Sequence, residues 1–475
     1  MSTDQTSTDQ TSTDQTSTDE TSTDETSGQP GRPEVAAAGE WTFPEPRVLE
    51  LPNGLTALVL DVPGQYVTSV RLTLPLPLRA EPRELEGVAW VMAGLLDEGT
   101  QQHDQRELSE MLERLGVGIG AGMSEGSLGV DLDVPQRHLG EALTLMTEIV
   151  REPAFTPGEV TRAVRTRLQD IEQERASAPH RAMRQLAATY YDPQTRASRP
   201  GAGSAQSVAA ITHDDVVAFH REHVHPHGGT VVVAGDLTDV DVDGLLEASL
   251  GSWTTPGPAQ EWERVPAPRA QDAARVVLVD RPGSVQSELI LATSGPDRRA
   301  PRWPAFPVLG YVIGGAPNAR IDAVLREEKG YTYGIRSGFR PRQVGGTFVV
   351  SGSVRADATV DSLRLLDEIL RDVADGVTPV EATSGVDFMT LTAPGRYATA
   401  DALADELAHL AADGLPLTFT SDTVAAMRRL TPEDLDAAWR EDVGTDWTVV
   451  VVGDASAYRD EVEALGIGPV SVVPA

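Results

Sequence analysis

The sequence of 475 residues contains no cysteine. Disulfide bonds, cysteine-ligated zinc, iron–sulfur clusters and cysteine nucleophiles are therefore excluded. Basic residues are also scarce, because 39 Lys and Arg stand against 72 Asp and Glu and give a formal net charge of −33 at pH 7. An acidic excess of this size repels phosphate groups, so it argues against nucleic acid and anionic membranes as partners.

Long apolar runs are missing as well. No stretch approaches the roughly 18 consecutive apolar residues of a membrane-spanning helix, and the start of the chain lacks the basic and apolar regions of a signal peptide. Residues 2–26 are instead five copies of STD(Q/E)T with seven carboxylates and no base. Such a segment has no apolar surface to bury, so we predict a disordered acidic tail over residues 1–40. We expect a cytoplasmic protein that binds neither nucleic acid nor membrane.

The chain repeats itself beyond this tail. Three pairs of segments match at a common offset of 218–220 residues. They are the helix starts at Thr212 and Thr431, the strands TVVVAGD at 230–236 and TVVVVGD at 448–454, and the helices LTLMTEIVRE at 143–152 and LRLLDEILRD at 363–372. Self-similarity at a fixed period indicates a duplicated domain.

The two copies set the expected domain organisation. Each alternates strands with helices without a strict β-α-β rhythm, which predicts an α+β fold of two duplicated α/β-sandwich halves. We place the first half at 41–253, a linker rich in Pro and charge at 254–275, and the second half at 276–475.

The finer pattern predicts particular elements. Pro52-Asn53-Gly54 is typical of the turn of a hairpin, which we place at 48–60. A helix is expected at about 85–97, and long helical patterns cover 156–191 and 398–413.

Four of the nine histidines lie within HREHVHPH and are His220, His223, His225 and His227. Such a cluster is one signature of a metal site. However, Pro226 breaks the helix inside the cluster, and no carboxylate lies one helical turn from a histidine pair as in a catalytic zinc helix. The matching segment of the second copy, WREDVGTDW at 439–447, contains no histidine. We therefore favour a helix-to-strand connection, with metal binding as the alternative.

The segment Gly122-Met123-Ser124-Glu125-Gly126 fits the G-x-S-x-G pattern of a serine nucleophile. That motif needs a strand before it and a helix after it, whereas the strand-like LGVDLDV follows here. We interpret the segment as a hairpin turn.

A third pattern, IDAVLREEKGYTYG at 321–334, combines the end of a helix with a returning strand. An apolar stripe runs through its first residues, and Gly330 is placed to end the helix. Arg326 and Tyr333 can then face one cleft, where a fixed cation and a phenol would hold a peptide carbonyl or its developing oxyanion. A structural hydrogen bond that joins the helix to the strand is the alternative.

Several of these segments together carry a family resemblance. They are LPNGLTALVL at 51–60, VVVAGDL at 231–237, GGAPNARIDAVLREEKGYTYG at 314–334 and the duplicated halves. With them, about residues 45–460 resemble the insulinase/pitrilysin family of inverzincin metallopeptidases, in its two-domain mitochondrial-processing-peptidase-like form. The resemblance implies two α+β domains of the insulinase type.

The resemblance fails at the metal site. Family peptidases carry H-x-x-E-H on a helix, in which two histidines hold zinc and the glutamate activates water. In the corresponding stretch at 87–100, Trp90 and Gly94 replace the histidines and Ala93 replaces the glutamate. A further zinc ligand, a glutamate on a later helix, corresponds to Asp170. Because Trp, Ala and Gly offer zinc no lone pair, we expect neither metal nor cofactor in this chain.

The resemblance also implies a role for Arg326 and Tyr333. In the family, an arginine and a tyrosine at this spacing come from the second domain and help to bind substrate. In heterodimeric bacterial members, the subunit without zinc supplies them. We therefore expect a non-catalytic subunit, inactive alone, of a heterodimeric zinc endopeptidase whose zinc-bearing homologous partner cleaves short or unstructured peptides. An acidic chamber wall would favour basic peptides.

The alternative function is that of a catalytically dead scaffold or interaction protein that keeps the peptidase fold. In that case Arg326 and Tyr333 are structural remnants. The resemblance also argues against an import presequence as the substrate, because Gly314-Gly315 is followed at once by Ala316-Pro317 and leaves no glycine-rich substrate loop.

Overall fold

The computed structural model describes residues 39–255 and 261–474. The chain divides into two compact units, Met1–Glu40 and Trp41–Ala475, and the second carries every described strand and helix. Apart from Gly39 and Glu40, the predicted acidic tail lies outside the described residues. The linker at 254–275 is described except for residues 256–260, and its bounds stay a prediction.

In the described part of the first half, six strands form one sheet in the order β1-β2-β6-β3-β5-β4. The strands are β1 (Arg47–Glu50), β2 (Thr56–Asp61), β3 (Val67–Pro75), β4 (Gly118–Met123), β5 (Ser127–Pro135) and β6 (Thr230–Gly235). β1 and β2 form an antiparallel hairpin whose turn holds Gly54 at a φ of 84°, so the predicted hairpin is confirmed. The serine-containing segment at 122–126 joins β4 to β5 as a hairpin turn, also as predicted.

The described part of the second half contains a matching sheet in the order β12-β7-β11-β8-β10-β9. Its strands are β7 (Val276–Asp280), β8 (Gln286–Gly295), β9 (Arg336–Pro341), β10 (Gly346–Arg355), β11 (Thr448–Gly453) and β12 (Val470–Pro474). The order β7-β11-β8-β10-β9 repeats β2-β6-β3-β5-β4, which confirms the duplicated α+β halves. Only the outermost strand differs between the two sheets. In the first sheet it is β1, which forms an antiparallel hairpin with β2, whereas in the second it is β12, the last described strand of the chain, which runs parallel to β7.

Helices of the first half are α1 (Val88–Ala93), α2 (Gln105–Leu115), α3 (Leu139–Arg151), α4 (Pro157–Ala176), α5 (Ala178–Tyr190), α6 (Ala205–Ala210), α7 (His213–His223) and α8 (Val242–Ala248). Those of the second half are α9 (Ala305–Gly310), α10 (Arg320–Asp322), α11 (Thr359–Asp375), α12 (Pro379–Leu391), α13 (Ala393–Arg396), α14 (Ala400–Asp413), α15 (Phe419–Met427), α16 (Pro432–Asp442) and α17 (Ala455–Ala464). None of these described helices has the length and apolar composition that crossing a bilayer requires.

Short helical turns complete the chain. The 3₁₀ turns are η1 (Leu78–Ala80), η2 (Arg83–Leu85), η3 (Gln136–His138), η4 (Arg196–Ser198), η5 (Leu250–Ser252) and η8 (Ala356–Ala358), and the π-helical segments are η6 (Tyr311–Gly315) and η7 (Ala323–Glu328). π-helical turns are rare in proteins as a whole, and those that occur are often found at functional sites.

The repeated helix starts have the same geometry. Thr212 caps α7 and accepts a hydrogen bond from the backbone N–H of Asp215 at 3.3 Å, while the Asp215 carboxylate accepts one from the backbone N–H of Thr212 at 2.9 Å. Thr431 and Asp434 make the same reciprocal pair at the start of α16. Both predicted caps are therefore confirmed as capping boxes.

Two predicted helices have different bounds in the structure. The helix expected at about 85–97 is reduced to α1, which ends at Ala93. The long pattern over 156–191 divides into α4 and α5 at Ser177, whose backbone is extended. Pro179 explains the break, because its ring would collide with the preceding turn of a continuous helix and it has no N–H to donate.

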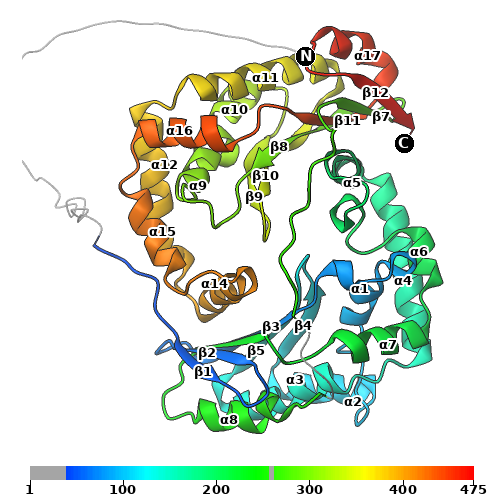
Figure 1. Cartoon of the computed structure of the whole chain (residues 1–475), viewed down its shortest axis with the longest axis vertical. Coiled ribbons are helices and arrows are strands. Elements are labelled where there is room, and N and C mark those ends of the chain that lie inside the picture. Colours follow the sequence, from blue (N-terminus) through cyan, green and yellow to red (C-terminus); the bar gives the residue numbers. More distant parts are fainter. Residues whose placement is uncertain (1–38, 256–260, 475) are drawn as a thin grey trace, which may run out of the picture. The chain divides into compact units, whose positions relative to one another are not determined.

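Each half covers the other half's sheet with one of its own helices (Figure 1). In the first half, α5 packs against β8 and β11 of the second sheet and buries Ala182, Leu186 and Tyr190 there. In the second half, α14 packs against β3 and β6 of the first sheet and buries Leu403 and Leu407. Since a sheet with an apolar face needs a layer over it, this exchange joins the halves through their hydrophobic cores.

Polar and aromatic contacts reinforce the position of α14. Arg71 of β3, whose side chain is only 8% exposed, donates through Nε to Asp405 of α14 at 2.6 Å. Trp41 stacks on Tyr397 with ring centroids 5.7 Å apart, and Phe43 meets the same ring edge-on at 5.1 Å. The start of the first half is thereby held by the segment that precedes α14.

The exchanged helices predict that neither half folds alone. A chain cut after residue 255 should give two fragments that aggregate when expressed separately and form a soluble equimolar complex when co-expressed, because each fragment lacks the helix that covers its sheet. Size-exclusion chromatography with light scattering measures this. Leu407→Asp, at a fully buried position, should abolish assembly, whereas His409→Asp on the exposed side of α14 should not. A folded, monomeric fragment 1–255 would contradict the prediction.

Candidate functional site

The start of α1 is fixed by a buried carboxylate. Glu81 accepts hydrogen bonds from the backbone N–H groups of Gly87 and Ala89 at 2.9 and 3.1 Å, and its side chain pairs with Arg196 at 2.8 Å. Burial raises the pKa of Glu81 against the opposing effect of Arg196. Gly87 has a φ of 104°, and a Cβ there would lie 2.9 Å from the carbonyl oxygen of Ala202, so only glycine fits this helix start.

The residues at the family's zinc positions lie on and beside α1. Trp90 is 46% exposed, Ala93 is buried, and Gly94 follows the last helical residue at the surface. A Cβ added at Gly94 would meet only the carbonyl oxygens of Trp90 and Val91, at 3.6 and 3.9 Å. The helix therefore has room for a larger side chain at 94, and its sequence rather than its packing removes the metal-binding groups.

Asp170, the predicted counterpart of the further zinc ligand, lies on α4, which packs against α1. Its side chain is exposed. A single carboxylate with Trp, Ala and Gly opposite does not form a zinc site, so the residues present do not fit the metal. Among residues 39–255 and 261–474, the structure places no group of three or more His, Asp or Glu side chains where they could hold a metal ion.

The histidine cluster has structural partners. His220 donates through Nε2 to the carbonyl oxygen of Val150 at 2.8 Å, and burial lowers its pKa. The ring of His223 meets Phe219 edge-on at 4.6 Å, and His225 donates to the backbone carbonyl oxygen three residues before it at 2.6 Å. His220 thus joins α7 to α3, His223 packs within α7, and His225 joins the segment after α7 to the end of that helix.

Arg326 and Tyr333 lie on either side of a sharp change of direction. Arg326 belongs to the π-helical segment η7, which continues α10, and Gly330 reverses the chain with a φ of 63°, as predicted. The predicted returning strand is wrong in its start, because β9 begins only at Arg336 and residues 331–334 form a loop. Tyr333 thus lies on a loop rather than inside a strand.

The side chain of Tyr333 is 95% exposed and makes no hydrogen bond to any described residue. Arg326 is 41% exposed, with Glu327 at 3.4 Å and Asp322 at 3.9 Å. Neither side chain joins the helix to the strand, so the structural alternative for this pair has no contact in its favour. The phenol of Tyr333 is open to a ligand, and the exposed part of the Arg326 guanidinium could reach one while it stays near Glu327 and Asp322.

Asp322 performs that joining role, and sequence reasoning missed it. Its side chain is fully buried, accepts a hydrogen bond from the backbone N–H of Ile335 at 3.0 Å and pairs with Arg336 at 2.5 Å. Thr332 adds a second anchor, donating to the carbonyl oxygen of Ser353 at 2.7 Å and accepting from the N–H of Gly334 at 3.0 Å. The available signal was an acidic residue inside the apolar stripe of the helix, which is costly unless it is paired.

Two family models match this chain, one within the first half and one from just before α7 into the second half. "Insulinase (Peptidase family M16)" matches residues 59–199, and "Peptidase M16 inactive domain" matches residues 210–384. The chain belongs to the insulinase family. The absence of the zinc-binding groups from α1 makes it a member of this peptidase family that lacks the catalytic motif.

Relatives of this insulinase-family chain include peptidases and a processing subunit. An uncharacterized zinc protease of Mycobacterium bovis is 25% identical over 340 residues, which cover 71% of this chain and 76% of the relative. The beta subunit of the mitochondrial-processing peptidase of Blastocladiella emersonii is 21% identical over 91% of this chain and 90% of its own length. A peptidase M16 inactive domain from Pseudomonas fluorescens has the same fold, with a TM-score of 0.79 and 24% identity over 86% of this chain and 98% of its own length.

The open surface of α1 predicts that zinc binding can be restored. The variant Trp90→His/Gly94→His/Asp170→Glu should bind stoichiometric zinc, because positions 90 and 94 share one helix face and α4 supplies the third ligand. Elemental analysis after dialysis measures the metal, with Trp90→His/Asp170→Glu as the matched control that lacks the second histidine. Equal zinc in the two variants would contradict the correspondence of these positions with the family motif.

The buried position of Asp322 predicts a large effect on stability. Asp322→Asn should lower the free energy of unfolding by about 2–4 kcal/mol, because it leaves Arg336 and the backbone N–H of Ile335 without a full partner. Urea denaturation measures this. In the matched surface pair with Arg355, Asp357→Asn should leave the free energy of unfolding almost unchanged, because solvent screens an exposed ion pair. Equal losses would show that Asp322 does not anchor the loop.

Proposed function

We propose that this chain is the non-catalytic subunit of a heterodimeric zinc metalloendopeptidase that cleaves short or unstructured peptides in the cytoplasm. The contrast between two sites carries the proposal. The zinc positions hold Trp90, Ala93 and Gly94, which cannot bind metal. Arg326 near the end of η7 and Tyr333 on the loop that follows are both exposed, and a buried contact of Asp322 anchors that loop. An anchored loop with an exposed phenol, following a helical segment with an exposed guanidinium, is suited to a ligand that another chain helps to hold.

The chemical role of the pair follows from its two groups. The phenol of Tyr333 can donate a hydrogen bond to a peptide carbonyl oxygen, and the guanidinium of Arg326 can stabilise the negative charge that develops there. A zinc-bearing homologous partner would supply the metal and the general base. Asp322 acts as a positioning residue, because it joins the helix before this loop to the backbone N–H of Ile335 after it and lies 3.9 Å from the guanidinium of Arg326.

An open strand edge supports peptide binding by the first half. β4, with the sequence GIGAGM, is the outermost strand of its sheet and packs beside α1. At its exposed glycines Gly118, Gly120 and Gly122, an added Cβ would meet no atom within 4 Å. An extended peptide can pair with such an edge through backbone hydrogen bonds without a steric conflict.

Reconstitution with a partner tests the proposal. Alone, the chain should be inert; mixed with a homologue that carries H-x-x-E-H, it should restore cleavage of an unstructured peptide. Tyr333→Phe or Arg326→Gln should lower kcat/KM of the mixture by about 10–100-fold, because each removes one group that holds the developing charge. Tyr66→Phe and Arg114→Gln are matched exposed controls and should leave kcat/KM unchanged.

Two outcomes would overturn this assignment. Full activity of the double variant Tyr333→Phe/Arg326→Gln in the reconstituted enzyme would remove the role of the pair. A stable complex that cleaves no peptide with any zinc-bearing homologue would favour the scaffold function instead.

A further inference from the structure

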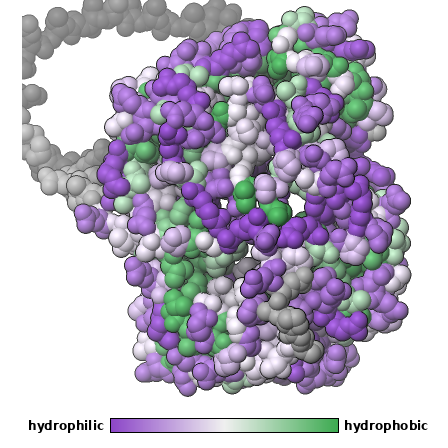
Figure 2. Space-filling model, in the orientation of Figure 1, coloured by the Kyte–Doolittle hydropathy of each residue, from purple (hydrophilic) through white to green (hydrophobic). Residues whose placement is uncertain are grey.

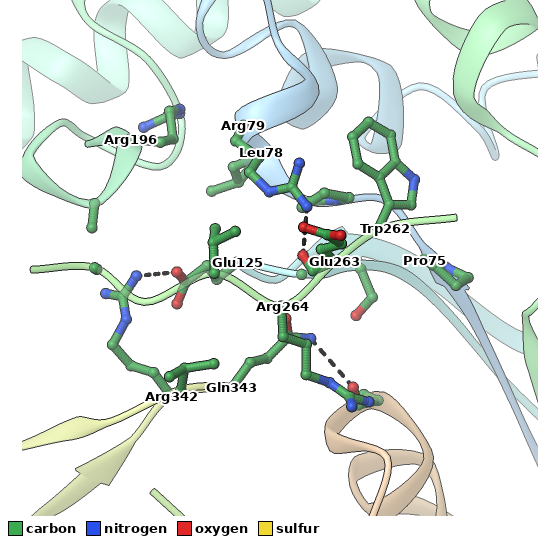
Figure 3. A pocket seen from close by; sticks show the side chains of 18 of the residues that line it. Pro75, Leu78, Arg79, Glu125, Arg196, Trp262, Glu263, Arg264, Arg342 and Gln343 are labelled. Carbon is green, nitrogen blue, oxygen red and sulfur yellow. Dashed lines mark hydrogen bonds and ion pairs between the residues drawn. The ribbon is translucent and has the colours of Figure 1, made fainter. Parts of the chain in front are cut away.

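A large cavity lies within the second unit, where the first half, the linker and the second half meet (Figure 3). It has a volume of about 940 Å³. Its wall includes η1 and the β4–β5 turn of the first half, residues 262–267 of the linker and the β9–β10 turn of the second half. Figure 2 shows the face of the molecule hollowed near its middle, with mainly hydrophilic residues around the opening.

Charged residues of the cavity wall are mostly basic, although the chain as a whole is strongly acidic. The wall contains five arginines and two glutamates: Arg79, Arg196, Arg199, Arg264, Arg342, Glu125 and Glu263. The expectation of an acidic chamber wall therefore does not hold at this cavity. A local excess of arginine inside an acidic protein is the reverse of what composition predicts.

Three of these arginines are neutralised by the protein. Arg196 pairs with the buried Glu81 at 2.8 Å, and Arg199 pairs with Glu86 at 2.8 Å. Arg342 pairs with Glu125 across the cavity, from the β9–β10 turn to the β4–β5 turn (Figure 3). These pairs shape the wall and leave little charge for a ligand.

Arg79 and Arg264 are different. Among the described residues, neither guanidinium has a carboxylate within the 4.0 Å of an ion pair. Arg79 instead donates to the backbone carbonyl oxygen of Glu263 at 2.5 Å and lies over the ring of Trp262 at 4.9 Å from its centroid. Two guanidinium groups are thus held at the wall without a carboxylate at ion-pair distance among the described residues.

The surroundings of Arg264 make its positive charge costly. Burial and then the nearby Arg299 lower the pKa of Arg264, and the carboxylate of Asp413 only partly opposes them. Arg299 donates to the backbone carbonyl oxygens of Asp413 and Gln343, which carry no formal charge. An anion that entered the cavity would relieve the repulsion between these two arginines.

We infer that this cavity binds the acidic segment of a peptide, with Arg79 and Arg264 holding its carboxylates. Guanidinium groups bind carboxylates through paired hydrogen bonds, and Trp262, Leu78 and Val265 add apolar surface to the same wall. The volume suits several peptide residues rather than a single small anion. This inference deepens the proposed function by naming the charge class of the peptide, and it rests on the chain being a peptide-binding subunit.

Direct binding to the full chain without any partner tests the inference separately from proteolysis. The probe is a fluorescein-labelled peptide of alternating Glu and Ser, with Gln/Ser and Lys/Ser peptides of the same length for comparison. Anisotropy at low salt should show tighter binding of the acidic peptide. Arg79→Gln/Arg264→Gln should weaken that binding about tenfold or more, because two charge-assisted contacts are lost.

Two matched variants should respectively strengthen the binding of the acidic peptide and leave it unchanged. Glu263→Gln should strengthen binding of the acidic peptide about two- to fivefold, because it removes a repelling carboxylate from the wall. Arg114→Gln/Arg459→Gln removes the same charge at exposed positions outside the cavity and should change nothing. Thermal unfolding checks that each variant is folded.

Three results would overturn the inference. The first is that Arg79→Gln/Arg264→Gln binds the acidic peptide as tightly as the original chain does. The second is that the chain prefers the Lys/Ser peptide. The third is that inorganic phosphate binds as tightly as the acidic peptide and displaces it. If any of these occurs while Tyr333→Phe still lowers cleavage in the reconstituted enzyme, the cavity assignment fails and the proposed function stands. If the acidic peptide binds as expected but Tyr333→Phe and Arg326→Gln leave cleavage unchanged, the cavity assignment stands and the proposed role of Arg326 and Tyr333 fails.

Discussion

The exchange of α5 and α14 between the two sheets is the contact on which the rest of the structure depends. Each helix buries its apolar face on strands that belong to the other half, so each half completes the other's hydrophobic core. Truncation of one buried leucine to alanine lowers the free energy of unfolding by about 2–5 kcal/mol. Leu186 on α5 and Leu407 on α14 are both buried, so each exchanged helix contributes substantially to stability. A duplicated sequence thus gives one interdependent unit rather than two separable domains.

The same exchange sets the surroundings of the functional groups. The C-terminal end of α14 reaches the arginine-lined cavity, where Ala411 and Ala412 form part of the wall. Gln343 of the β9–β10 turn donates to the carbonyl oxygen of Ala412 at 3.3 Å and ties that turn to the exchanged helix. The exchanged helix therefore forms one part of the cavity wall.

The sequence was sufficient to predict the duplicated α+β halves, because the matching strands and the capping threonines Thr212 and Thr431 are local patterns. It was also sufficient to identify the degenerate zinc helix. It did not predict which helix covers which sheet, since an apolar face does not specify its partner. Nor did it predict the role of Asp322 or the basic cavity wall. Both depend on contacts between distant residues, such as Arg79 with Glu263, that only the folded chain brings together.

The most direct test of the central claim is whether residue 333 contacts substrate in the assembled enzyme. Tyr333 is replaced by the photoreactive analogue p-benzoylphenylalanine, and the chain is irradiated with an unstructured peptide in the presence and absence of a zinc-bearing homologue. The same replacement at Tyr66, which is also exposed, serves as the control. The account predicts a crosslink between position 333 and the peptide that requires the partner and is absent from position 66. A mixture that cleaves the peptide but forms no crosslink at 333 would contradict it.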